Sequence, residues 1–192
     1  MKEDKIWELA KPYLKKGMKK NFVLHTEGVL NAIEMICREE NGNLEVLIPA
    51  AILHDTGWAI VSAEYQKLSD KKKLLIGEEL HIEYGVKIAK DILKQLGYDL
   101  QISNKIIDII RCHKFTETNT IDKKIFIDAD NLADIFKEQF YSDSRRYQVT
   151  PWVNFNFRKK NKFFTQTAQE IFDRELAERK REIEKNASQR SA

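Results

Sequence analysis

The sequence contains few of the residues that break helices and few cysteines. Only 7 glycines and 3 prolines occur among 192 residues, and no stretch has the composition of a Gly/Ser-rich or Pro-rich linker. Two cysteines, Cys37 and Cys112, do not make a disulfide framework, so we expect a reducing, cytoplasmic location. No apolar run approaches the roughly 20 residues that a membrane helix needs. The charged start MKEDKIWELA is not typical of a secretion signal.

An excess of charge of one sign is also absent. Lys and Arg number 33, Asp and Glu number 30, and the net charge is +3. The basic clusters at 15–20, 70–73 and 158–162 are separated along the chain, so we do not expect nucleic acid or a membrane as the partner. A mildly basic rim is better suited to small molecules that carry phosphate.

Abundant Lys, Glu, Leu, Ile and Ala with helical periodicity predict an all-α fold. The apolar stripes predict helices over about 6–14, 22–41, 47–57, 81–96, 102–112, 122–140 and 163–185. Pro49 is expected in the first turn of its helix. Residues 62–80 are expected to form a partly helical surface insertion and 142–152 a loop, and NFNF at 154–157 is the best strand candidate. The aromatic segment 147–157 could pack the last helix or form a lid, and we favour packing.

One apolar segment runs directly into two ionisable residues. Ala50 to Leu53 is followed by His54 and Asp55. Burying such side chains costs free energy unless hydrogen bonds, mutual contact or a metal ion satisfies them. The chain has four histidines, and each falls at or near the end of an expected helix, where converging helices could bring them together: His25, His54, His81 and His113.

Carboxylates accompany these histidines in an otherwise apolar segment, FIDADNLADIF. Asp130 and Asp134 are four residues apart and share a helical face, with Asp130 at the edge of the apolar stripe. Asp134 is expected to be a solvated surface charge. Imidazole nitrogen and carboxylate oxygen together form the ligand set of Zn, Fe, Mn, Co or Ni.

The ordered pattern His25, His54-Asp55, Asp130 resembles the HD-domain superfamily of metal-dependent phosphohydrolases. The flanking segments LHTEGVLNAI, AAILHDTGW and DADNLADI carry the resemblance, which covers roughly residues 20 to 140. It implies a compact helical bundle of the HD-domain type with a long C-terminal helix. Residues 1–192 would form a single domain, with the metal-site core at about 20–140 and a C-terminal helical extension at about 141–192.

The resemblance also implies a ligand set for one or two divalent ions, whether Fe, Mn, Co, Ni, Zn or Mg. The first ion would be held by His25, His54, Asp55 and Asp130. His81 and His113 would hold a second ion or the phosphate, with Asp55 bridging, so that Asp55, His81 and His113 are the catalytic candidates. Asp128 would orient a ligand or be a helix N-terminal charge.

The implied reaction is hydrolysis of a phosphomonoester or phosphoanhydride, with a nucleotide as the expected substrate, by attack of a metal-bound hydroxide. Lys114, Arg145 and Arg146 are the candidate phosphate-binding cations, together with Arg158. A di-iron oxygenase and a non-catalytic nucleotide-binding regulatory module remain alternatives. The sequence lacks a GYP signature and an acidic pair after His54-Asp55, which argues against cyclic-dinucleotide and alarmone substrates. A homodimer through the last helix is also possible.

Overall fold

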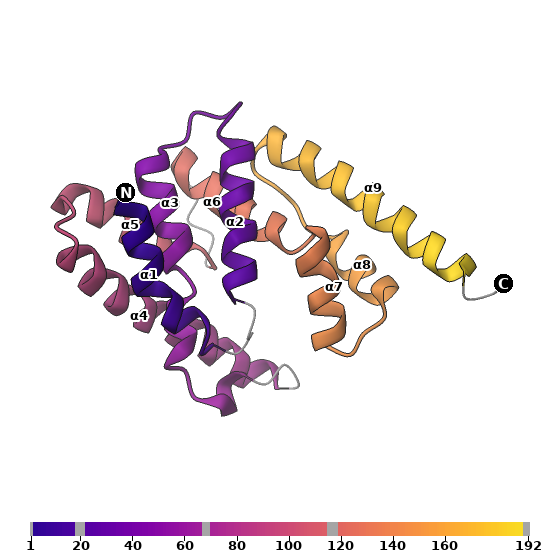
Figure 1. The fold of residues 1–192 in the computed structure, drawn as a ribbon, viewed down its shortest axis with the longest axis horizontal. Coiled ribbons are helices and arrows are strands. Elements are labelled where there is room, and N and C mark those ends of the chain that lie inside the picture. The colour runs from indigo at the N-terminus through magenta and orange to yellow at the C-terminus, as the bar shows by residue number, and fades with distance from the viewer. Residues whose placement is uncertain (1, 18–21, 67–69, 115–118, 190–192) are drawn as a thin grey trace.

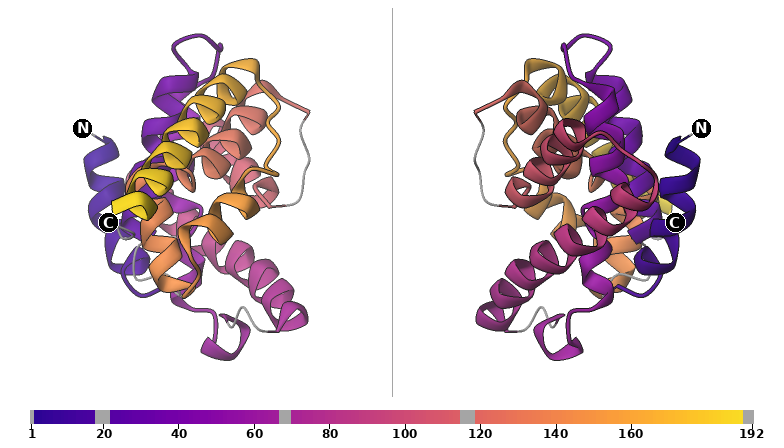
Figure 2. Two further views of the ribbon diagram at one scale, coloured as in Figure 1. Left: turned by 90° about the vertical axis from the view of Figure 1, so that its right-hand side faces the viewer. Right: turned by 90° about the vertical axis from the view of Figure 1, so that its left-hand side faces the viewer.

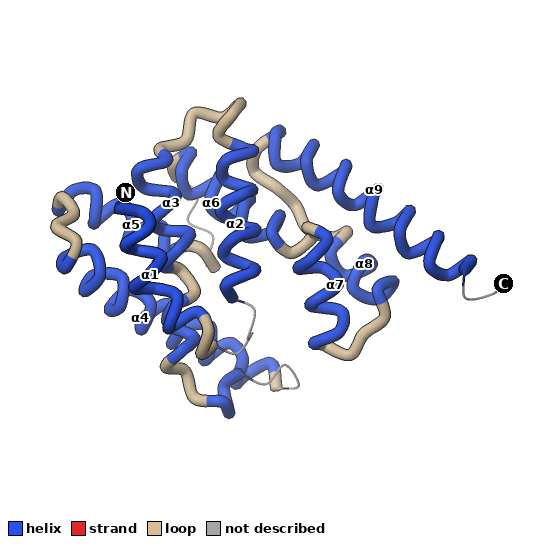
Figure 3. The backbone as a smooth tube through the Cα atoms, in the orientation of Figure 1, coloured by secondary structure: helices blue, strands red, loops and turns tan. Residues whose placement is uncertain are grey.

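The computed structural model describes residues 2–17, 22–66, 70–114 and 119–189, and within these ranges every regular element is a helix or a helical turn (Figures 1 and 3). The elements are α1 (Lys2–Leu14), α2 (Phe22–Ile36), α3 (Leu44–Leu53), η1 (Thr56–Ala59), η2 (Ala63–Gln66), α4 (Lys71–Gln95), α5 (Leu100–Cys112), α6 (Ile121–Ala133), α7 (Lys137–Arg146), α8 (Pro151–Arg158) and α9 (Gln166–Gln189). The predicted all-α fold is confirmed.

The first six helices form a body around one apolar core. α2 packs against α6 and α3, α3 packs against α5, and the short 3-10 helix η1 packs against α4. Fully buried side chains from these helices fill the centre, including Ile33, Leu47, Leu53, Ile106 and Phe126. Burial of such side chains supplies the main driving force for folding.

The last three helices form a second group beside this body. α7 packs against α8, and α8 packs against α9. α9 also contacts α6 and then runs away from the body towards the C-terminus (Figure 1), and it faces the viewer in the left view of Figure 2. The C-terminal helices therefore join the body next to α2 and α6, the helices that carry two of the candidate metal ligands.

The helix starts follow from capping residues in the sequence. The side chain of the N-cap residue accepts a hydrogen bond from a first-turn backbone N–H at Asn43, Asp70, Asp99, Thr120 and Thr150. Each of these bonds satisfies one donor that has no partner within the helix.

Two of the expected helix starts are wrong. α4 begins at Lys71 after its cap Asp70, so His81 lies in the interior of a helix and not at its start. The residues ahead of His81 are mostly exposed, as expected for 62–80, but they are more helical than the partly helical insertion that the sequence predicts. α3 begins at Leu44 after its cap Asn43, so Pro49 lies beyond the first turn where it was expected.

The segment after Asp130 also differs from the expectation. The helix expected over 122–140 ends at Ala133, and α7 starts at Lys137, so most of the predicted loop at 142–152 is helical. NFNF lies within α8 because Thr150 caps a helix that has Pro151 in its first turn. Phe155 in this helix is buried, whereas Phe157 is exposed.

Among the described helices, none combines the length and the apolar character needed to cross a membrane. The basic cluster at 15–20 lies only partly within the described residues, because residues 18–21 fall outside them.

Candidate metal centre

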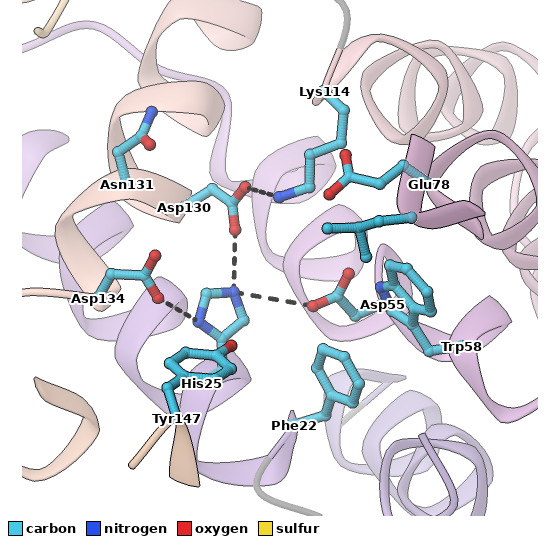
Figure 4. Close-up of a pocket in the computed structure, with 11 residues that line it drawn as sticks. Phe22, His25, Asp55, Trp58, Glu78, Lys114, Asp130, Asn131, Asp134 and Tyr147 are labelled. Carbon is cyan, nitrogen blue, oxygen red and sulfur yellow. Dashed lines mark hydrogen bonds and ion pairs between the residues drawn. The ribbon is translucent and has the colours of Figure 1, made fainter. Parts of the chain in front are cut away.

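Six predicted ligands converge from separate elements and are all buried. His25 lies in the first turn of α2, His54 and His113 are the C-cap residues of α3 and α5, and Asp55 precedes η1. His81 comes from the interior of α4, and Asp130 comes from α6. The exposed fraction of each residue is 7% or less. Figure 4 shows His25, Asp55 and Asp130 facing one another.

His25, His54 and Asp130 form the first of two triads, with ligand atoms that all lie within 4.8 Å of one another. Nε2 of His25 is 2.9 Å from Oδ1 of Asp130, and Nε2 of His54 is 3.6 Å from the same oxygen. Nitrogen and oxygen atoms bound at about 2.0–2.2 Å to one ion lie about 3–3.6 Å apart. The spacing of the first triad therefore fits a shared metal ion.

Asp55, His81 and His113 form the second triad. Nε2 of His81 is 3.2 Å from Nε2 of His113 and 3.7 Å from Oδ1 of Asp55. The other oxygen of Asp55, Oδ2, is 3.3 Å from Nε2 of His54 in the first triad. One oxygen of Asp55 thus faces each triad, which is the placement that a bridging carboxylate requires.

Three of the four imidazole rings have a polar group at Nδ1. His54 donates from Nδ1 to the carbonyl of Ala51 (2.8 Å), and His113 donates to the carbonyl of Ile110 (2.7 Å). Nδ1 of His25 lies 3.6 Å from Oδ1 of Asp134, an ion-pair distance. These contacts turn Nε2 of each ring towards the centre, as the outer contacts of metal-binding histidines usually do.

The fourth ring, that of His81, is positioned by stacking. Its centroid lies 4.4 Å from that of the Trp58 ring, with an interplanar angle of 8°. Trp58 can reach this position because Gly57 brings η1 against the backbone of α4. A Cβ atom at Gly57 would lie 1.9 Å from the carbonyl oxygen of His81. Only glycine allows this approach.

Several buried polar atoms at the centre have no hydrogen-bond partner within the described part of the chain. They include Nε2 of His54 and Oδ1 of Asp55. Leaving such groups unpaired costs about 1–3 kcal/mol each. A divalent cation in the first triad would satisfy Nε2 of His54, and one in the second triad would satisfy Oδ1 of Asp55. The donor set and these unpaired atoms therefore fit one or two metal ions, and such an ion would explain why His54 and Asp55 follow an apolar segment.

The charge states of four ligands suit metal binding. Burial raises the pKa of Asp55, but the positive charge of His54 lowers it more, and the net pKa lies well below the usual range. Burial likewise raises the pKa of Asp130, but the positive charge of Lys114 lowers it more, and its net pKa also lies well below the usual range. Burial lowers the pKa of His81 to about 4 and holds that of His113 well below its ordinary value. Ionised carboxylates and neutral imidazoles are the forms that bind metals.

His54 has the opposite shift. Burial lowers its pKa, but the nearby carboxylates of Asp55 and Asp130 raise it, and the net result is a pKa of about 10. The two carboxylates thus attract positive charge to the space between them, whether a proton or a metal ion.

A cavity of about 140 Å³ opens onto His25 and Asp130 of the first triad and onto Asp55 (Figure 4). Lys114 lies in its wall, with Nζ 2.7 Å from Oδ2 of Asp130 and 29% of its side chain exposed. The rest of the lining includes aromatic residues that sequence reasoning did not select, Phe22, Trp58 and Tyr147, and the acidic Glu78. Trp58 had a sequence signal in HDTGW, three residues after Asp55, and Tyr147 begins the aromatic segment 147–157, for which a lid was the less favoured alternative.

The other candidate phosphate-binding residues do not line this cavity. Arg145 is exposed, and the guanidinium of Arg146 lies 5.6 Å from the ring of Tyr147. Neither arginine lines the cavity, and their phosphate-binding roles stay predictions. Arg158 is buried and pairs with Asp134 and Asp143.

Asp128 of α6 and Asp134, the C-cap residue of that helix, both differ from what the sequence predicts. Asp128 accepts hydrogen bonds from the backbone N–H groups of Phe164 and Thr165 and from the Thr165 hydroxyl, each at 2.8 Å. These bonds direct Asp128 towards the segment before α9 and not towards a metal ligand. Asp134, expected at the surface, is only 15% exposed and faces His25. The contact with a ligand expected of Asp128 is thus made by Asp134.

Comparison with known proteins gives one match. A family model described as "HD domain" matches residues 22–135, more than half of the chain. No curated protein and no solved structure matches. All six candidate ligands and Lys114 lie within the matched range, whereas α7, α8 and α9 lie beyond it.

Proposed function

Because the chain belongs to the HD-domain family, whose members are generally metal-dependent hydrolases, we propose that it hydrolyses a phosphomonoester or phosphoanhydride with one or two divalent ions. A nucleotide is the first substrate class to test. The observation that carries the proposal is the pair of buried triads that meet at Asp55, beside a cavity with a lysine in its wall.

Each candidate ligand has a defined task in this proposal. His25, His54 and Asp130 would hold the first ion, His81 and His113 the second, and Asp55 both. A bound divalent ion lowers the pKa of its water to about 7 and polarises a phosphoryl oxygen. The chain itself supplies the fixed geometry, because every one of these side chains is buried and held by packed helices.

The charge of the cavity supports metal dependence. The carboxylates of Asp55 and Asp130 outnumber the ammonium group of Lys114, and Glu78 adds a further negative charge. The metal-free protein would therefore repel a phosphate, and divalent ions would reverse the sign. Lys114 would then donate a hydrogen bond to a phosphoryl oxygen, since its Nζ lies next to Asp130 at the cavity wall.

The size of the cavity bears on how a substrate would bind. Its volume of about 140 Å³ is well below the roughly 300–1,000 Å³ of pockets that enclose drug-sized ligands. The phosphoryl group would enter it, and the organic part would extend from it past Tyr147, an aromatic residue of the lining that is only partly buried. An aromatic side chain there suits a flat ring such as a nucleobase.

The test combines metal analysis with an activity assay. The chain is purified without added metal, its metal content is measured, and phosphate release from p-nitrophenyl phosphate and from nucleoside mono-, di- and triphosphates is followed with Mn, Co, Mg, Zn or Fe. We expect metal-dependent release that Asp55→Asn abolishes. The matched control is Asp91→Asn, which changes an exposed carboxylate of α4 and should retain activity.

The alternatives become distinct outcomes of this experiment. Bound metal without phosphate release from any substrate would contradict the proposal. Iron content with oxygen consumption in the presence of an organic substrate would indicate an oxygenase. Tight nucleotide binding without product would indicate a regulatory module. A cytoplasmic location and a homodimer stay predictions from the sequence.

A further inference from the structure

A buried arginine reaches the end of α6 from the C-terminal helices. Arg158 is the last residue of α8, beyond the range that the family model matches, and is 9% exposed. Its Nη1 group pairs with Oδ2 of Asp134, and its Nη2 group lies 2.9 Å from Oδ2 of Asp143. Burying a guanidinium is costly unless carboxylates pair with it. The two aspartates supply that pairing from α7 and from the C-cap of α6.

Asp134 connects this arginine to the first triad. One of its oxygens faces Arg158, and the other lies 3.6 Å from Nδ1 of His25. On the other edge of the same ring, Nε2 of His25 lies 2.9 Å from Asp130 (Figure 4). A carboxylate at Nδ1 favours a proton there and leaves the Nε2 lone pair for a metal ion. Arg158 thus contacts Asp134, and Asp134 contacts His25, which belongs to the candidate metal centre.

The arginine is itself held in place. Asp143 is 1% exposed, and its second oxygen accepts a hydrogen bond from the side chain of Gln139 (2.8 Å). Burial alone would lower the pKa of Arg158, but Asp134 and Asp143 raise it, so the guanidinium remains charged. A planar guanidinium fixed by one carboxylate can orient another with little loss of conformational entropy.

We propose that Arg158 is a positioning residue for the first metal ion. Arg158 acts by fixing Asp134 against His25. The proposal rests on the metal centre described under the proposed function and adds the C-terminal helices to it. Because His113 is held by Ile110 and His81 by Trp58, the second triad does not depend on this contact. Loss of Arg158 should therefore affect the two ions unequally.

The experiment measures metal affinity directly in the full chain. Mn²⁺ and Zn²⁺ are titrated against a chromogenic chelator into the wild type, Arg158→Met and Asp134→Asn. We expect about 10–100-fold weaker binding of the first ion, the usual effect of losing a group that orients a metal ligand, and unchanged binding of the second. The matched control is Arg179→Met, because Arg179 of α9 is also a buried arginine paired with two carboxylates. Its Nη2 lies 3.9 Å from Oε2 of Glu175, and its Nε lies 3.4 Å from Oε2 of Glu182. Its loss should leave both affinities unchanged.

Further measurements separate positioning from general destabilisation. Arg158→Lys keeps the positive charge and should restore part of the affinity if Arg158→Met folds poorly. In nitrogen-15 NMR spectra of the zinc-loaded chain, which has four histidines, the Nδ1–H signal of His25 should shift in Asp134→Asn. Wild-type affinity in folded Arg158→Met and Asp134→Asn would overturn the inference and leave the proposed function intact. A wild type that binds no metal would overturn both.

Discussion

The structure predicts that removing the carboxylate of Asp128 destabilises the fold without weakening metal binding. Asp128 is fully buried and accepts three hydrogen bonds from Phe164 and Thr165. They join α6 to the segment that leads into α9. Asp128→Ala would remove the acceptor and leave the backbone N–H of Thr165, a residue only 5% exposed, without this partner.

The expected loss follows from the environment of each donor. A hydrogen bond to a charged acceptor contributes about 1.5–3 kcal/mol, and a buried donor left unpaired costs about 1–3 kcal/mol. Phe164 is 46% exposed, so water can replace part of its bond. Burial also raises the pKa of Asp128, although the hydrogen bonds from Phe164 and Thr165 oppose the shift. Because this desolvation cost offsets part of the gain, we expect a net loss of about 3 kcal/mol for Asp128→Ala. Asp128→Asn keeps one acceptor oxygen and should lose about half as much.

Urea unfolding followed by circular dichroism measures this loss in the wild type, Asp128→Asn and Asp128→Ala. Metal titration of the same folded samples should give unchanged affinities, because the bonds of Asp128 point towards α9. The reasoning would be refuted by an unchanged unfolding midpoint. A fall in metal affinity at unchanged stability would refute it as well, and would support the ligand-orienting role that the sequence predicts for Asp128.

Three further substitutions test the centre itself. Gly57→Ala should destabilise the fold by about 3 kcal/mol, because its Cβ would lie 1.9 Å from a backbone oxygen of His81, and a fall in the thermal midpoint measures this loss. Trp58→Leu should weaken binding of the second ion alone, because Trp58 stacks on His81. It should also abolish the metal-induced change in tryptophan fluorescence, which the control Trp152→Phe should retain. Equal weakening of the binding of both ions would contradict the stacking role. Lys114→Met should lower kcat/KM about 10–100-fold with the metal content unchanged, and a wild-type kcat/KM would exclude contact with the phosphoryl group.

The candidate ligands could be predicted from the sequence because they occur in a characteristic order along the chain, each in an apolar context. His54 and Asp55 are adjacent at the end of an apolar helix, and His25 and Asp130 lie in recognisable apolar contexts. The structure brings these four side chains together. The prediction that converging helix ends gather the histidines is right for His25, His54 and His113 but wrong for His81. The ring of His81 reaches the centre from mid-helix, where Trp58 stacks on it.

The supporting residues could not be assigned from the sequence, because they depend on tertiary contacts. Asp130 and Asp134 are about 40° apart around a helix, so their shared face was predictable. That face meets α2 at His25 and α8 at Arg158. The sequence around Asp130 and Asp134 does not predict either of these contacts. Asp128 is an equally plausible support in sequence, yet it faces another way and bonds to Thr165.

The C-terminal helices are therefore part of the site and not an appendage to it. The family match ends at residue 135, but Asp134 is paired with Arg158 and Asp128 is bonded to Thr165, both beyond that limit. Tyr147, also beyond it, lines the cavity. A chain cut after residue 135 would keep every candidate ligand and lose the buried partners of two aspartates on α6. The matched segment contains the candidate ligands, but Asp134, which faces His25, is paired with a residue that follows the segment, Arg158.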